Sequence, residues 1–424
     1  MRSQMLRPAQ ILELQRQRLA AMVSFAHAGL PFYRPRLAPL LGGGQGLDFS
    51  RWHEVPILDR QTVQGHFAEL TSATVPPQSG AITEKFTSGS SGRVLRLLRS
   101  DLARDFNAAL TQRAYTWWRL DPRAVLATIM TIGDDHADIL DPQADLAWHY
   151  DPSSGPAHAL QAGTPPDQQA QLLRQRRADY LITYPSIAEA LADQVLGAGL
   201  PLALKAVLPV GESLKPEHRQ LFARAFGARS YDSYGCIEAG HVAAECPICG
   251  CYHVDAESVL LEVVDDRGLP VGPGETGRAV LTSLNNFAMP LIRYDIGDRI
   301  TTVNRGNRCK RGLPSIAAIK GRETELFVTR AGELYFPPIL ARDVAQYLDL
   351  TEIQFVQTDY ETVELRYVPG QRGIASRDQE LRDFVESRIG HGITMKLVPV
   401  AELPRLRGAK QAMKLSLVPR PARH

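Results

Sequence analysis

Apolar and polar positions along the chain switch repeatedly between a helical spacing and short strand-like runs. Apolar residues at helical spacing predict helices over 101–118, 168–177 and 187–198. Short apolar runs before and between them predict buried strands over 125–132, 180–183 and 203–210. Helices that alternate with strands are typical of an α/β fold.

From residue 254 onward, strands dominate the pattern. Apolar runs at 259–264 and 278–282 predict two strands, with a turn at Asp266-Arg267-Gly268 between them. The last hundred residues predict a strand, a helix and a strand, over 361–368, 379–388 and 394–400.

These patterns divide the chain in two near Gly321-Arg322. We expect a large N-terminal domain over 1–320, with mixed sheets and a β-rich subdomain at about 240–315. A small α+β domain over 321–424 would follow it as a mobile lid.

Composition narrows the class of protein. With 424 residues, 44% of them hydrophobic, the chain can bury a large core. Its 48 basic and 46 acidic residues form no long block of one sign, which argues against nucleic acid as a partner. No apolar run is long enough to span a membrane. Residues 1–19 suit an amphipathic helix better than a secretory signal, so we expect a cytoplasmic protein.

Four of the five cysteines fall within sixteen positions, a poor layout for a disulfide scaffold. Cys246 and Cys249 have the Cys-x-x-Cys spacing that lets two thiolates hold one tetrahedral zinc ion. Cys251 and His253 offer further ligands. The alternatives are buried free thiols or a redox pair, and the turn around Pro247 favours zinc.

A hydroxyl-rich and glycine-rich run suggests a phosphate-binding loop. Its residues are Thr87, Ser88, Gly89, Ser90, Ser91 and Gly92. Hydroxyl groups and unobstructed backbone N–H groups suit the phosphates of ATP, although the lysine of a Walker loop is absent. The alternative is a flexible turn.

Three further segments suit nucleotide chemistry. In the segment 231–238, Tyr234 could pack on adenine and Glu238 could hold Mg²⁺. Without the other motifs, the simpler interpretation is that Tyr234 is a core aromatic residue and Glu238 a solvated charge. Segment 293–299 puts two carboxylates around a glycine turn, where one could accept hydrogen bonds from ribose or merely belong to a charged turn. Lys410 offers a cation for a carboxylate and an α-phosphate.

Together these motifs resemble the adenylate-forming superfamily of acyl- and aryl-CoA ligases, most closely the shorter branch typified by phenylacetate-CoA ligase. The resemblance covers nearly the whole chain. Further segments that carry it are Gly29–Arg34, Tyr184–Ser186, Gly211-Glu212, Pro290–Tyr294, Gly321-Arg322 and Gly408–Lys410.

The resemblance implies a two-step reaction with ATP, Mg²⁺ and coenzyme A. A carboxylic acid, aromatic in this branch, would be converted to acyl-AMP with release of pyrophosphate, and a thiol would then displace AMP. Residues that would bind the nucleotide are the 87–92 run, Gly211, Glu212, Asp232, Tyr234, Gly235, Asp298 at the ribose and Arg322. Glu238 would bind Mg²⁺ and Lys410 would be the adenylation lysine, with Lys414 as the alternative.

The resemblance also implies a structural zinc and a homodimer. The ligands of the zinc ion would be Cys246, Cys249, Cys251 and Cys309, with His253 as the competing choice for Cys251. The acid pocket would include residues 128–136, where Asp134, Asp135 and His136 could recognise an amino or hydroxyl group or form a solvated turn.

Some residues depart from the family pattern. Ile237 stands where a hydroxyl is usual, Val94 where proline is usual, and Thr324-Glu325 where two aspartates are usual. Two alternatives therefore stay open: an enzyme that passes the acyl group to an amine or a carrier-protein thiol, and a non-catalytic binding protein.

Overall fold

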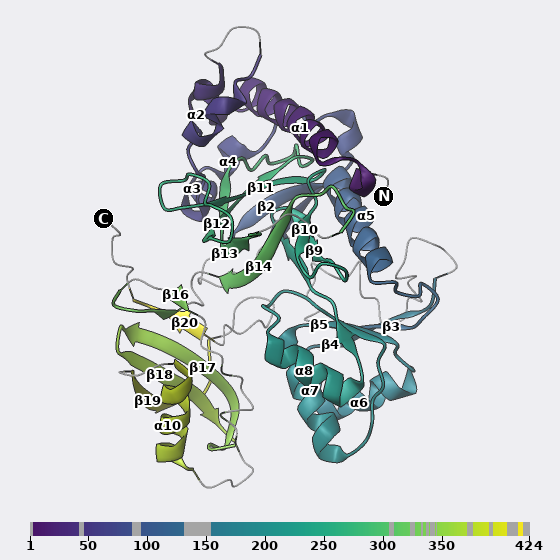
Figure 1. The fold of residues 1–424 in the computed structure, drawn as a ribbon, viewed down its shortest axis with the longest axis vertical. Helices are drawn as coiled ribbons and strands as arrows, with labels where there is room; N and C mark the ends of the chain where they lie inside the picture. Colours follow the sequence, from purple (N-terminus) through teal and green to yellow (C-terminus); the bar gives the residue numbers. More distant parts are fainter. Residues whose placement is uncertain are drawn as a thin grey trace. The chain divides into compact units, whose positions relative to one another are not determined.

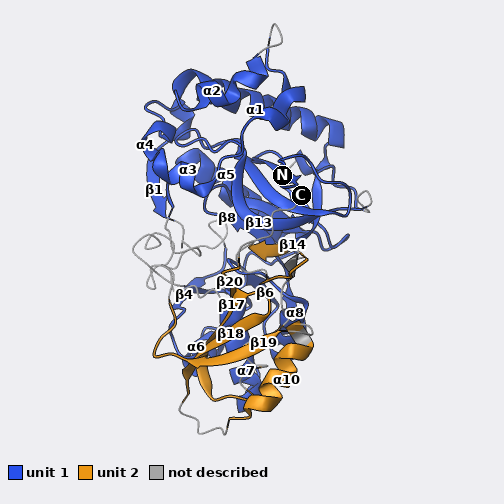
Figure 2. Cartoon of the chain, turned by 90° about the vertical axis from the view of Figure 1, so that its left-hand side faces the viewer, with its two compact units in different colours: residues 1–87, 95–319 blue, residues 88–94, 320–424 orange. Residues whose placement is uncertain are grey.

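The structure is a computed structural model. It describes residues 3–41, 46–86, 95–130, 154–304, 309–322, 327–331, 334–335, 339, 344, 346–370, 376–389, 393–404 and 414–418. Described residues up to Ile319 form one compact unit and those from Lys320 onward form a second (Figure 2). No described helix is both long and apolar enough to cross a membrane.

The first unit contains the predicted N-terminal helix as α1 (Pro8–Gly29), which begins and ends later in the chain than the predicted segment 1–19. It buries Ile11 and Leu19, and Gln15 donates from Nε2 to the backbone oxygen of Val259, 2.7 Å away. Short helices follow, and then an antiparallel hairpin of β1 (Ile82–Phe86) and β2 (Arg96–Ser100).

A five-stranded parallel sheet confirms the α/β prediction. Its order is β4-β3-β5-β6-β7. Figure 1 labels β3, β4 and β5 of this sheet. The strands are β3 (Leu126–Met130), β4 (Ala157–Gln161), β5 (Tyr180–Thr183), β6 (Ala206–Pro209) and β7 (Arg229–Ser230). Helices α6 (Pro166–Gln175), α7 (Pro185–Ala198) and α8 (Pro216–Phe226) share one apolar cluster with β3, β5 and β6.

A seven-stranded antiparallel sheet forms the β-rich part, in the order β11-β12-β13-β14-β10-β9-β8. The strands are β8 (Ser233–Cys236), β9 (Gly240–Glu245), β10 (Tyr252–Val254), β11 (Val259–Val264), β12 (Thr276–Ser283), β13 (Tyr294–Thr302) and β14 (Ser315–Arg322). Helix α5 (Asp101–Trp117) packs against β9, and the oxygen of Ser100 caps its start as an acceptor (Figure 1).

One detail of the prediction is wrong in this sheet. The glycine turn expected within 293–299 lies inside the continuous strand β13. Gly297 has φ +80°, a left-handed conformation that glycine adopts without strain, and its N–H donates to Asp295 Oδ1 at 2.9 Å. The residue therefore kinks a strand and does not reverse the chain.

The second unit has a four-stranded sheet in the order β19-β18-β17-β20. Its strands are β17 (Leu350–Asp359), β18 (Thr362–Pro369), β19 (Thr394–Pro399) and β20 (Lys414–Ser416), with helix α10 (Asp378–Ile389). The predicted strand, helix and strand are present. Strand β17 was not predicted, and it pairs with both β18 and β20.

Candidate functional site

Two predicted motifs meet at the carboxyl ends of the parallel strands. Ser186 follows β5 and Glu212 follows β6. The backbone N–H and the hydroxyl of Ser186 donate to the Glu212 carboxylate at 3.0 and 2.9 Å. Gly211 between them has φ +74°, which explains why glycine stands there. In open parallel sheets this edge is where ligands bind, near the point where the strand order reverses, here between β3 and β5.

The antiparallel sheet brings together two other motifs. Tyr234 on β8 donates its hydroxyl to Asp298 Oδ2 on β13, 2.6 Å away. Three strands lie between β8 and β13 in the sheet order. Four strand spacings of about 4.8 Å would separate them by about 19 Å in a flat sheet. The sheet must therefore curl, and curling is what joins these side chains.

Glu238 lies in the connection between β8 and β9 and is buried. One carboxylate oxygen is 3.5 Å from the hydroxyl of Tyr294, too far for a strong hydrogen bond. Burial lowers the pKa of Arg99, and the negative charge of Glu238 opposes that shift. Glu238 therefore interacts electrostatically with a half-buried arginine beside the curled sheet.

Gly235 keeps this connection tight. A Cβ atom at Gly235 would come within 2.8 Å of the backbone oxygen of Gly240 on the paired strand. A larger residue would force β8 and β9 apart, and with them the segment that holds Glu238.

Asp232, a predicted nucleotide-binding residue, is buried and hydrogen-bonded. Its carboxylate accepts a hydrogen bond from Tyr252, with 2.6 Å between the oxygens. Burial raises the pKa of Asp232 to about 6, against the opposing effect of the Tyr252 hydrogen bond. Its backbone N–H donates to Glu245 Oε2 at 3.0 Å, and Glu245 also pairs with Arg219. The carboxylate therefore belongs to a buried network at the junction of the two sheets.

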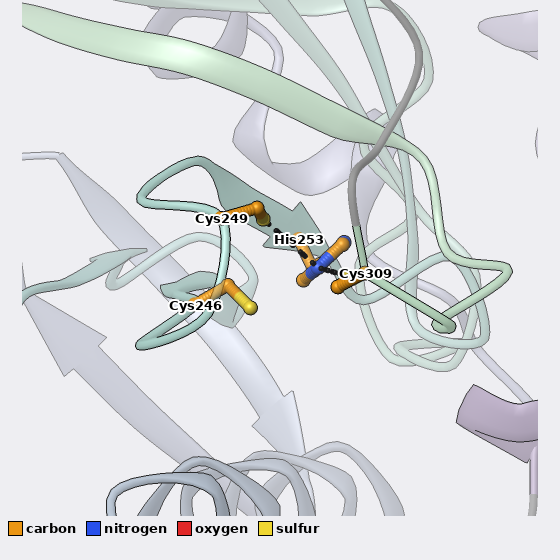
Figure 3. Close-up of side chains that lie close together, drawn as sticks. All are labelled: Cys246, Cys249, His253 and Cys309. Carbon is orange, nitrogen blue, oxygen red and sulfur yellow. Dashed lines mark hydrogen bonds between the residues drawn. The ribbon is translucent and has the colours of Figure 1, made fainter.

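Four metal-ligating side chains lie close together at the end of β9 and β10 (Figure 3). They are Cys246, Cys249, His253 and Cys309, with ligand atoms within 4.8 Å of one another. The His253 Nε2 lies 3.0 Å from the sulfur of Cys309 and 3.8 Å from that of Cys249. Tetrahedral zinc, with bonds of about 2.0–2.3 Å, requires ligand separations of about 3.5–3.8 Å. The grouping favours His253, the competing choice, over Cys251.

The surroundings of this cluster suit a metal. Ser315 Oγ lies 3.0 Å from Nδ1 of His253, which leaves Nε2 facing the sulfurs. Burial, aided by the charge of Arg311, lowers the pKa of His253 to about 4, so the imidazole is neutral, the form that binds metals. Arg311 donates to the sulfur of Cys246 at 3.0 Å and lies over the ring of Trp117. A cation is thus placed beside a cluster that would carry negative charge.

A buried ionic cluster under α5 was not predicted. Arg113 donates to Asp255 Oδ1 at 2.5 Å and to Glu257 Oε1 at 2.6 Å, and all three side chains are buried. His241 on β9 joins it through Nδ1, 2.5 Å from Asp255 Oδ2. The available signal in the sequence was a histidine directly before the apolar residues 242–244 of β9.

Several predicted residues lie outside the described residues. These are the 87–92 run, Val94, Asp134, Asp135, His136, Thr324, Glu325 and Lys410. The strands flanking the glycine-rich run pair in the β1–β2 hairpin. Arg322 ends β14, and Lys414 is buried on β20.

Comparisons with known proteins agree with this architecture. No protein-family model matches the chain. A phenylacetate-coenzyme A ligase from Thermus thermophilus is 24% identical over 446 residues, which cover 95% of this chain and 96% of that protein. One from Pseudomonas putida is 29% identical over 203 residues, 45% of this chain and 44% of that protein.

Solved structures match the fold. A 2-hydroxyisobutyryl-CoA ligase in the postadenylation state has a TM-score of 0.71 at 20% identity, with 99% of this chain and 92% of that chain covered. MatB from Rhodopseudomonas palustris has a TM-score of 0.54 at 17% identity, with 80% and 68% covered. The chain therefore shares the fold of a 2-hydroxyisobutyryl-CoA ligase. The distant relatives that align over most of the chain carry the name phenylacetate-coenzyme A ligase.

Proposed function

We propose that the protein activates a carboxylic acid as an acyl-AMP and then transfers the acyl group to the thiol of coenzyme A. The observation that carries this proposal is the Tyr234–Asp298 hydrogen bond, which joins two nucleotide-type motifs 64 residues apart. The alignment with a phenylacetate-coenzyme A ligase over 96% of that protein supports the reaction class and favours an aromatic acid.

In the first step, a carboxylate oxygen of the acid bonds to the α-phosphorus of ATP and pyrophosphate leaves. Asp298 would accept hydrogen bonds from the ribose, and Tyr234, held by Asp298, would present its ring to the base. Glu238 would hold Mg²⁺, which neutralises charge on the phosphate oxygens when bound. Glu238 is buried, and its one hydrogen-bond contact among the described residues is the long one to Tyr294, which fits a cation ligand.

In the second step, the thiol sulfur bonds to the acyl carbon, the bond from that carbon to AMP breaks, and the thiol proton passes to solvent. We assign the positive charge that assists the first step to Lys410. Lys414 is a poorer choice because it is buried in strand β20.

We assign a structural zinc ion to Cys246, Cys249, His253 and Cys309. These four ligands would fill a tetrahedral shell and leave no open position for a reacting group. The ion would tie the β9–β10 connection to the segment that precedes β14. Its role is therefore to stabilise the curled sheet that carries Tyr234 and Asp298.

The test is pyrophosphate release from Mg·ATP with a panel of aromatic and aliphatic acids, with and without coenzyme A. Acid-dependent release is expected, with loss of at least about 100-fold in Lys410→Ala. Lys396→Ala, which removes an exposed lysine of β19, is the matched control and should retain activity.

Each outcome has a defined meaning. A coenzyme A thioester product supports the full proposal, whereas release without any thioester would assign the acyl group to an amine or a carrier protein. No release with any acid, while ATP still binds, would contradict adenylation.

A further inference from the structure

We propose that His241 recognises a hydrogen-bond donor, a hydroxyl or amino group, on the acid substrate. The inference rests on the proposed function and adds a substrate class to it. It makes His241 a specificity-determining residue of the acid pocket.

The position of His241 is fixed from two sides. Its Nδ1 lies 2.5 Å from Asp255 Oδ2, and its backbone N–H donates to Asn107 Oδ1 at 2.8 Å. Asp255 is held in turn by Arg113. Gly240 before it has φ +79°, and a Cβ there would come within 2.7 Å of Asn107 Oδ1. The glycine therefore lets β9 approach α5 closely enough to set the imidazole in place.

The second ring nitrogen of His241, Nε2, is engaged differently from Nδ1. In the neutral imidazole, the nitrogen that faces the Asp255 carboxylate, Nδ1, carries the proton, and Nε2 presents a lone pair. That Nε2 is buried and has no hydrogen-bond partner among the described residues, in a side chain only 7% exposed. A buried polar atom without a partner is costly, and in functional proteins it indicates a ligand or an ordered water.

The other buried histidines of the described chain use both ring nitrogens. His218 accepts from the backbone N–H of Lys215 at its Nδ1 and faces Glu189 with Nε2 at 3.5 Å. His253 uses Nδ1 with Ser315 and Nε2 in the metal cluster. Among the three buried histidines of the described residues, only His241 therefore has a ring nitrogen without a hydrogen-bond partner.

The location connects His241 to the acid. On the β8–β9 ladder, His241 is directly opposite Gly235, which follows Tyr234. Glu238 lies in the turn that joins these strands. The reacting carboxylate must lie at the α-phosphate, between the groups assigned to the nucleoside and those assigned to Mg²⁺. The remainder of the acid then extends close to His241, where Nε2 can accept from a hydroxyl or amino substituent but gains nothing from a plain ring.

The experiment compares acids with and without the donor. Pyrophosphate release is measured with phenylacetate and benzoate and with their 2-, 3- and 4-hydroxy and amino derivatives. His241→Asn keeps an N–H at the Nδ1 position for Asp255 and removes the Nε2 acceptor, whereas His241→Gln restores an acceptor near the Nε2 position. His218→Asn, at a buried histidine with both nitrogens engaged, is the matched control.

The unmodified protein should prefer one donor-bearing acid over its plain parent by about 10-fold or more in kcat/KM. His241→Asn should abolish that ratio with its thermal midpoint retained, His241→Gln should recover part of it, and His218→Asn should leave it unchanged. An unchanged ratio in His241→Asn, or a preference for plain acids in the unmodified protein, would overturn the inference while adenylation stands. Absence of release with every acid would instead mean that the proposed function has failed.

Discussion

The two sheets of the first unit position their polar residues in different ways. At the edge of the parallel sheet, Ser186 and Glu212 meet because each follows the carboxyl end of a neighbouring strand. In the antiparallel sheet, Tyr234 and Asp298 meet because the sheet curls across three intervening strands. The first arrangement depends only on where two neighbouring strands end. The second depends on the contacts that keep the whole seven-stranded sheet curled.

The largest expected effect comes from removing the metal cluster, which would open the curled sheet. Cys246→Ser, or chelation, should lower the free energy of unfolding by at least about 5 kcal/mol, because a closed zinc site contributes directly to folding. Zinc content by elemental analysis and denaturant unfolding would measure this.

Two variants identify the fourth ligand of the proposed zinc ion. His253→Ala should lose the metal, and Cys251→Ser should keep one equivalent. The reverse pattern would restore the cysteine-only set and contradict the structural grouping.

The ionic cluster under α5 should have the next largest effect. Arg113→Met leaves Asp255 and Glu257 buried without their partner, which costs about 3–5 kcal/mol. Denaturant unfolding would measure the loss. Arg219→Met is the control, since the Arg219–Glu245 pair is more exposed and should cost about 1 kcal/mol or less. Equal losses would show that burial of the cluster is not what anchors α5 to the sheet.

Asp232 connects the two sheets and predicts a pH dependence. Its pKa is about 6 in the folded protein against 3.8 as the ordinary value, so the folded state holds its proton more tightly. Stability then falls as pH rises through this window. Asp232→Asn should remove that dependence, so its stability relative to the unmodified protein should rise by about 2 kcal/mol between pH 4.5 and 7.5. A difference that is flat with pH would contradict the assigned cause.

The smallest effect is expected at the parallel edge. Glu212→Gln should cost about 1 kcal/mol or less, because the Ser186 hydrogen bonds are exposed and local. A double-mutant cycle with Ser186→Ala isolates the pair. A coupling above about 2 kcal/mol would mean that this edge depends on more than its two strand ends.

The sequence predicts best those features that depend on neighbouring residues. Strands β5 and β11 have the predicted bounds, because continuous apolar runs decide them. Strand β17 was missed because buried polar residues interrupt its pattern. Gln357 is fully buried there and exchanges two hydrogen bonds with the backbone of Val328.

The sequence predicts less well the contacts between residues that are far apart in the chain and meet only when the sheet curls. It indicated Tyr234, Glu238 and Asp298 as nucleotide-binding candidates, but not that Tyr234 would hold Asp298. It left Cys251 and His253 as alternatives for the fourth zinc ligand, because the spacing of the residues allows both. It gave no sign that His241 pairs with Asp255, since that contact depends on how β9 meets the turn after β10.

The most direct test of the central claim is acid-dependent ATP–pyrophosphate exchange in two variants of the same strand. Asp298 accepts from Tyr234, whereas Asp295, three residues earlier, pairs with Arg278 at 2.9 Å. If the curled sheet forms one nucleotide site, Asp298→Asn should lose at least about 10-fold in exchange with a raised KM for ATP, and Asp295→Asn should stay close to the unmodified protein. Equal exchange in the two variants, or full activity in Asp298→Asn, would contradict the account.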